Sequence, residues 1–158
     1  MRKLVIAVST VATALMAALM AAAPAGATPP SAVSGTEAIT GATATVVRTA
    51  DGNTILANTL TGIIAGSFTG TFTAEFTTIV HPSGQTNVAN GTFNCTCSIA
   101  GRSGSVTFRF EGTGSPSATE IHAETIGATA GLVGLHSNLT VDVVGAAATY
   151  SGTAHFDS

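Results

Sequence analysis

Three alternating polar residues, Glu120, His122 and Glu124, are the clearest group in this 158-residue sequence that could do chemistry. Residues two apart in a β-strand share a face, so two carboxylates would flank one imidazole. Such groups bind divalent metal ions or serve as a general acid–base pair. His136 and Asp142 lie on the polar face of a second expected strand. The pattern favours a solvated outer face for all five; a polar patch inside a barrel mouth and a metal site are the alternatives.

Motifs that would name a reaction are missing from the sequence. There is no G-x-S-x-G nucleophile elbow, no H-E-x-x-H zinc motif, no Walker A loop and no G-x-G-x-x-G opening a helix. The sequence therefore indicates no catalytic residue, no metal and no cofactor, and it favours a non-catalytic role.

The first 27 residues read as a secretory signal peptide. Arg2 and Lys3 precede an apolar stretch over 4–23, and an A-x-A cleavage box ends at Ala27. An uncleaved membrane anchor is the alternative, because the stretch is long enough to span a bilayer. We expect cleavage after Ala27, secretion to the extracellular space, and no stable membrane anchor after cleavage.

Removal of the signal peptide leaves three arginines, Arg48, Arg102 and Arg109, against eight acidic residues, for a net charge of −5. Three scattered cations cannot neutralise a phosphate backbone, so nucleic-acid binding is excluded as a function class. An anionic membrane surface is disfavoured for the same reason.

The two cysteines, Cys95 and Cys97, share one face of an expected strand. Two cysteines in a secreted protein favour a disulfide. In a regular strand, however, their Cα atoms would be about 6.6 Å apart, so a bridge would need a bulge or turn at Thr96. Two buried thiols and a soft-metal site remain as alternatives.

The chain after residue 36 alternates like β-strands throughout. In residues 68–80, Phe68, Phe72 and Phe76 share one face, while Glu75 and several threonines share the other. Residues 105–111, 136–143 and 149–156 repeat this alternation. The apolar faces supply the residues expected to fill a barrel or to line a cavity inside it: Phe68, Phe72, Phe76, Phe108, Phe110, Leu139, Val141 and Tyr150.

Clusters of turn residues separate the expected strands, and glycines within the strands allow them to bend around a barrel. They predict an all-β fold, a small antiparallel closed β-barrel of about eight strands, with a β-sandwich as the alternative. The Pro- and Ser-rich residues 28–36 are expected to be a flexible leader. Residues 37–158 are then expected to form a single barrel domain.

Two segments carry a resemblance to a known family. Residues 101–106 (GRSGSV) resemble the G-R-S-G-S-F turn of a bacterial family of unknown function, which belongs with the allene oxide cyclase barrel-like, or dirigent-like, proteins. Residues 129–135 (TAGLVGL) are similar to its T-G-x-L-x-G-L segment. The resemblance covers about residues 66–156 and implies a small antiparallel barrel. Relatives of this barrel type often assemble, so a homo-oligomer is one possibility, but the sequence does not indicate the oligomeric state. The catalytic residues of the cyclases have no counterpart here, and the leader and the Cys95-Thr96-Cys97 segment depart from the pattern.

Two function classes follow from these observations. One is a secreted, non-catalytic barrel that holds a small apolar ligand inside. The other is a cyclase- or isomerase-type enzyme that uses the same cavity. An ionisable residue on an apolar strand face would favour the enzyme, and the clear strands show none there.

Overall fold

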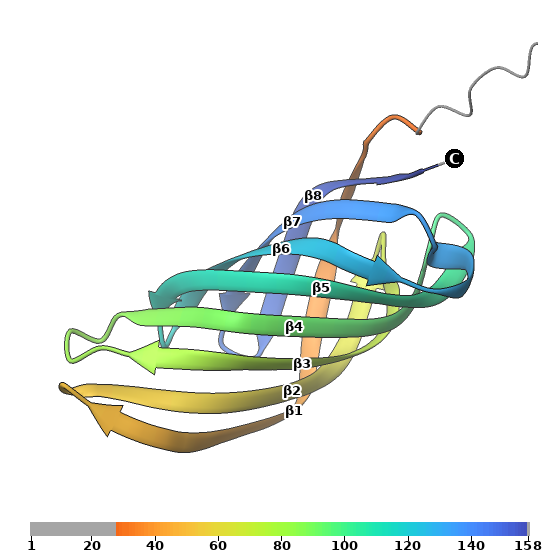
Figure 1. The fold of residues 1–158 in the computed structure, drawn as a ribbon. Coiled ribbons are helices and arrows are strands. Elements are labelled where there is room, and N and C mark those ends of the chain that lie inside the picture. The colour runs from red at the N-terminus through yellow and green to blue at the C-terminus, as the bar shows by residue number, and fades with distance from the viewer. Residues whose placement is uncertain (1–27, 158) are drawn as a thin grey trace, which may run out of the picture.

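Eight antiparallel strands close into a barrel in the computed structural model, which describes residues 28–157. Each strand pairs with its neighbours in sequence, and β8 pairs with β1 to complete the ring (Figure 1). The strands are β1 (Ser31–Ala50), β2 (Asn53–Gly66), β3 (Thr69–Val80), β4 (Thr86–Ile99), β5 (Arg102–Ser115), β6 (Ala118–Ala128), β7 (Leu135–Val144) and β8 (Ala147–Phe156). The predicted closed barrel is confirmed, and the sandwich alternative is wrong. The expected signal peptide, 1–27, lies outside the described residues.

The barrel core follows the alternation in the sequence. Phe68 and Val106 are almost completely buried, while Glu75 and Arg109 lie on the exposed face of their strands. All eight residues expected inside the barrel point inward; Phe76 is half-buried and the other seven are buried. Period-2 patterning therefore set the inner and outer faces of these strands.

Local turn chemistry explains where the strands reverse. Asp51 and Gly52 form the tight turn between β1 and β2, and both have positive φ angles, as such hairpin turns require. Asn90 also has a positive φ, but it lies within β4, where the register with β5 shifts between Val88 and Gly91. The Asn90-Gly91 pair is therefore a bulge within the strand, although Asn-Gly is also a common hairpin-turn sequence.

The N-terminal segment differs from the expected flexible leader. Ser31 to Thr36 belong to β1 and pair with β8, from Ser31 opposite Ala154 to Thr36 opposite Thr149. Thr28 is also held, because its N–H donates to the carbonyl oxygen of Phe156 at 3.0 Å. The prolines and serines suggested a linker, but pairing with a strand more than a hundred residues away overrides that local signal.

The two ends of the barrel are different. A short 3-10 turn, η1 (Ala130–Leu132), covers one end, where Leu132 and Phe68 are fully buried. At the other end β1 pairs with β8 only as far as Ala38, although it continues to Ala50 beside β2. The β1–β2 and β3–β4 hairpins therefore extend beyond the ring at the left of Figure 1. This end of the lumen is open.

Among residues 28–157, no helix has the length and apolar character needed to cross a bilayer.

Candidate functional site

A small cavity lies inside the barrel towards its open end. Its volume is about 60 Å³, which is room for a few water molecules. Aromatic and aliphatic side chains form nearly all of its wall, from Ile64, Phe72 and Phe108 to Ile39 and Leu60 beside the open end. Most of the lumen is therefore filled by side chains, and the remaining space is apolar.

A chain of aromatic contacts fixes the shape of the lumen. The Phe72 and Phe93 rings stack with centroids 4.6 Å apart, and Phe108 meets the edge of Phe93 at 5.7 Å. Phe76 and Phe110 form a second pair, at 5.6 Å, nearer to the open end. Such contacts pack the aromatic wall closely around the remaining space.

Glu37 is the one ionisable side chain on the wall of this cavity. It lies on the inner face of β1, opposite Ile64 on β2 and Ala148 on β8. Burial raises the pKa of its carboxyl group to about 7, from an ordinary value of 4.5. No side chain among residues 28–157 donates a hydrogen bond or pairs with it as a cation. At neutral pH its protonated and ionised forms are both populated.

The presence of Glu37 corrects the expectation of an uncharged barrel interior. The signal was present in the sequence, because Val33, Gly35, Glu37 and Ile39 alternate on one face of a strand. The Pro- and Ser-rich composition of residues 28–36 hides this signal, because it predicts a flexible leader over the first half of the alternating segment.

Tyr150 is the other titratable group that borders this region, and its hydroxyl is already satisfied. It accepts a hydrogen bond from the Phe68 N–H at 2.9 Å and lies 3.3 Å from the carbonyl oxygen of Ala65. Burial raises the pKa of this phenol, and the charge of Glu37 adds to the rise. Tyr150 is therefore a structural neighbour of Glu37 and stays protonated at neutral pH.

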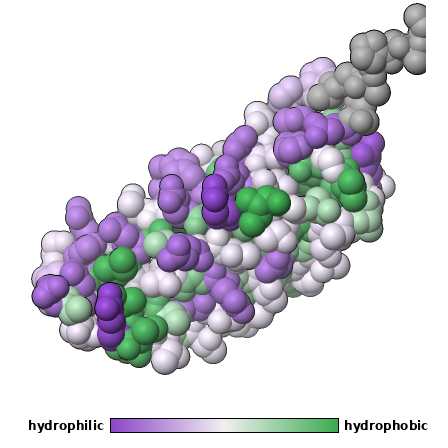
Figure 2. Space-filling model, in the orientation of Figure 1, coloured by the Kyte–Doolittle hydropathy of each residue, from purple (hydrophilic) through white to green (hydrophobic). Residues whose placement is uncertain are grey.

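The predicted Glu120, His122 and Glu124 group lies on the outer face of β6. His122 Nε2 is 3.2 Å from Glu120 Oε1, and Arg109 on β5 pairs with Glu124. Asp142 lies opposite Glu120 across the β6–β7 ladder. A shallow groove of about 600 Å³ runs over this face, between Asn90 on β4 and side chains of β7. The visible surface in Figure 2 shows mostly hydrophilic and neutral side chains over these strands.

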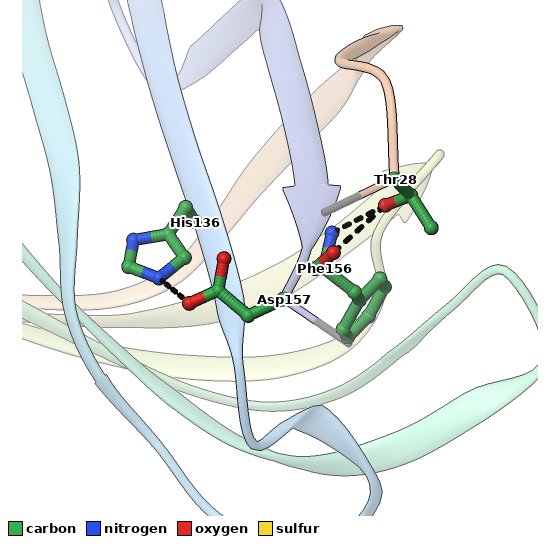
Figure 3. A network of polar contacts seen from close by, with 4 residues as sticks. All are labelled: Thr28, His136, Phe156 and Asp157. Carbon is green, nitrogen blue, oxygen red and sulfur yellow. Dashed lines mark hydrogen bonds and ion pairs between the residues drawn. The ribbon is translucent and has the colours of Figure 1, made fainter. Parts of the chain in front are cut away.

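His136 is separated from that group. It lies near the opposite end of β7, where its Nε2 is 2.8 Å from Asp157 Oδ2 (Figure 3). Its ring also stacks on that of His155, with centroids 5.3 Å apart. Both members of the His136–Asp157 pair are about half exposed. Within residues 28–157, no group of three histidine, cysteine or acidic residues is placed to hold a metal ion.

The structure places Cys95 and Cys97 as a disulfide within β4. Both residues are buried, and their Cα atoms are 5.5 Å apart, inside the usual range for such a bond. The ladder with β3 continues without a shift through Thr96, which lies opposite Thr71. The bulge or turn at Thr96 that we expected a disulfide to require is therefore absent.

The comparisons with known proteins are structural. No protein-family model and no curated protein sequence matches this chain. A crystal structure of a protein of unknown function from the DUF3224 family of Shewanella oneidensis MR-1 superposes with a TM-score of 0.70 and 16% identity, covering 82% of this chain and all of that one. An enzyme from Penicillium herquei gives a TM-score of 0.54 with 17% identity, over 80% of this chain and 96% of its own. At these identities the likeness shows a shared barrel fold.

Proposed function

We propose that this protein is a secreted barrel that binds the apolar part of one small ligand in its lumen. The observation that carries the proposal is Glu37, a carboxyl group that has no hydrogen-bond or ion-pair partner among residues 28–157 and lies on the wall of an otherwise apolar cavity. Glu37 is partly buried, and partial desolvation of a carboxyl group without a hydrogen-bond donor is unfavourable, so a ligand group that hydrogen-bonds to it would be favoured.

The size and shape of the cavity narrow the ligand class. Pockets that enclose a whole drug-sized molecule measure about 300–1,000 Å³, far above the free volume here. We therefore expect a compact molecule, or one ring or alkyl end of a longer molecule, to enter past Ile39 and Leu60. A hydrogen-bond acceptor such as a carbonyl oxygen would then meet the protonated form of Glu37.

Acetophenone and ethylbenzene are matched probes for this proposal, because they differ mainly in one carbonyl oxygen. Binding is measured by titration, following backbone amide NMR shifts at lumen residues. We expect both probes to shift these signals, and acetophenone to bind about tenfold tighter below pH 7, as one additional hydrogen bond allows. If neither probe shifts the lumen signals at millimolar concentration, the proposal is wrong and the barrel interior is structural.

Two variants distinguish an effect of the Glu37 carboxyl on probe affinity from the effect of removing any one negative charge. Glu37→Leu should abolish the preference for acetophenone while ethylbenzene still binds. Glu75→Leu is the matched control, because Glu75 is exposed on the outer face of β3. It should leave both affinities unchanged.

An enzyme of cyclase or isomerase type is the second candidate, and the same carboxyl favours it. A carboxyl with a pKa of about 7 can remove a proton from carbon and return it at neutral pH. The resemblance to allene oxide cyclase barrel-like proteins and the Penicillium herquei enzyme both support this candidate only through the fold.

Hydrogen exchange at carbon tests this candidate without knowledge of the natural substrate. In D₂O, ionised Glu37 would take a methyl proton from acetophenone to give the enolate, and deuterium would return to the same carbon. NMR then follows the loss of the methyl signal. A rate that Glu37→Gln reduces at least tenfold, with acetophenone still bound, supports catalysis; equal rates for the two proteins support binding alone.

A further inference from the structure

The second half of β1 is a free sheet edge. β1 pairs with β8 from Ser31 to Ala38, and the Ile39 N–H makes a last contact with the carbonyl oxygen of Ala146 at 3.3 Å. From Thr40 to Ala50 it pairs only with β2. Among residues 28–157, no strand lies on the other side, and β1 forms the lower margin of the molecule in Figure 1.

Apart from two bulges, this edge lacks the usual features that prevent strands from pairing. Natural edges are protected by lysines, prolines, inward charges, β-bulges or a covering segment. Gly41–Val46, with the sequence GATATV, contains no charge and no proline, and nearly all of it is exposed. Val46 and its neighbour Val47 are 59% and 61% exposed. Figure 2 shows apolar side chains on the surface at this lower-left end of the molecule.

Two bulges delimit the regular part of the edge. The register with β2 shifts between Ile39 and Gly41 and again between Val46 and Arg48. Between these shifts the ladder is regular, from Gly41 opposite Thr61 to Val46 opposite Leu56. A segment of this length is typical of one β-strand, and its ends are defined by the fold itself.

We propose that Gly41–Val46 pairs antiparallel with the same segment of a second copy, so that the protein is a two-fold symmetric dimer with one continuous sheet across both barrels. A second copy is the occupant because an antiparallel edge is complementary to itself: each unpaired N–H meets a carbonyl oxygen under a two-fold axis. The two segments also match in length, since the same bulges end both.

The charges around the edge agree with this arrangement. Arg48 is the only charged residue between Thr40 and Ala50. In any register centred within Gly41–Val46, the two Arg48 side chains lie at opposite ends of the two paired strands. Like charges therefore do not face each other. The paired faces would carry threonine beside threonine and alanine beside valine, which are favourable cross-strand neighbours.

Sedimentation velocity on the protein purified from the culture medium tests the dimer, at concentrations between about 1 and 100 µM, where weak dimers dissociate. We expect a dimer that Ala44→Lys weakens at least tenfold, because lysine at the joint brings two like charges together. Ala57→Lys is the matched control: Ala57 is also exposed, but it lies on β2, which is paired on both sides. It should leave the dimer intact.

Hydrogen–deuterium exchange of the unmodified protein locates the joint without relying on a variant. Amides within Gly41–Val46 should exchange more slowly at high protein concentration than at low concentration. The exchange rates of the amides in β6, which is paired on both sides within the barrel, should not depend on concentration. A monomer throughout the concentration range, or a dimer whose affinity Ala44→Lys does not alter, overturns the proposal. Slow exchange of this segment only in a complex with a different protein overturns it as well.

Discussion

The hydroxyl group of Tyr150 on β8 accepts a hydrogen bond from the backbone N–H of Phe68, with 2.9 Å between oxygen and nitrogen. Both residues are almost completely buried, and their rings meet edge to face with centroids 6.0 Å apart. The contact joins the segment between β2 and β3 to the last strand of the ring. It therefore stabilises the closed end of the barrel.

Removing this hydroxyl should destabilise the barrel. Tyr150→Phe leaves the buried Phe68 N–H without its partner, which costs about 1–3 kcal/mol of unfolding free energy. Chemical denaturation followed by circular dichroism measures the difference. Thr149→Val removes an exposed hydroxyl next in sequence and should change stability by less than about 0.5 kcal/mol. Equal stability of Tyr150→Phe and the unmodified protein would show that the contact is not formed.

Phenylalanines at the two ends of the lumen should differ in their contribution to stability. Phe68 is fully buried at the closed end, whereas Phe76 is half-buried near the open end. Phe68→Ala should cost about 3–5 kcal/mol, the usual range for a core aromatic, and Phe76→Ala clearly less. Chemical denaturation of the two variants tests this order of stability, provided that the dependence of the unfolding free energy on denaturant concentration has the same slope in both. A larger loss for Phe76→Ala would contradict the assignment of the open end.

The stability of the protein should depend on pH through Glu37. Its pKa is raised to about 7 in the folded state, so its proton is bound more tightly there than in the unfolded chain, where the value is 4.5. The protonated carboxyl therefore gives full stability below about pH 4.5, and stability is lost as the pH rises through about 7. The total loss is on the order of 3 kcal/mol.

Glu37→Gln provides the comparison, since its side chain does not titrate. The difference in unfolding free energy between this variant and the unmodified protein should grow between pH 4.5 and 7.5 and then level off. Glu75→Gln, on the exposed outer face, should follow the unmodified protein at every pH. Parallel pH profiles for Glu37→Gln and the unmodified protein would mean that this carboxyl is not buried.

The redox state of the cysteines can be measured directly. With Cys95 and Cys97 joined, the denatured but unreduced protein should contain no titratable thiol. The loop between them is so short that the bond should add only about 2 kcal/mol or less to stability. Two thiols per chain would identify the pair as free and buried instead.

Cleavage of the proposed signal peptide predicts a defined mature N-terminus. Edman sequencing of protein from the culture medium should begin at Thr28. Its side-chain hydroxyl bonds to the backbone of Phe156 (Figure 3), and its N–H donates to the carbonyl oxygen of the same residue. The new terminus would then be anchored on β8. A chain that still begins at Met1 in the membrane fraction would contradict both cleavage and secretion.

The sequence by itself determined the faces of most strands. Alternation at Phe72, Phe108 and Val141 needs only the period of two that every pleated strand imposes, and it placed these side chains inside before any pairing was known. Turn chemistry at Asp51-Gly52 is equally local. The same reasoning placed Glu120, His122 and Glu124 on an outer face, where the structure has them.

Only the tertiary structure decided which strands meet and where their pairing stops. The pairing of Ser31 with Ala154 turned an apparent leader into a strand and brought Glu37 into the lumen. The end of that ladder at Ala38 left the rest of β1 as a free edge. Neither follows from a local pattern, because the closure of a barrel depends on hydrogen bonds between residues more than a hundred positions apart and on the stagger that all eight strands accumulate around the ring.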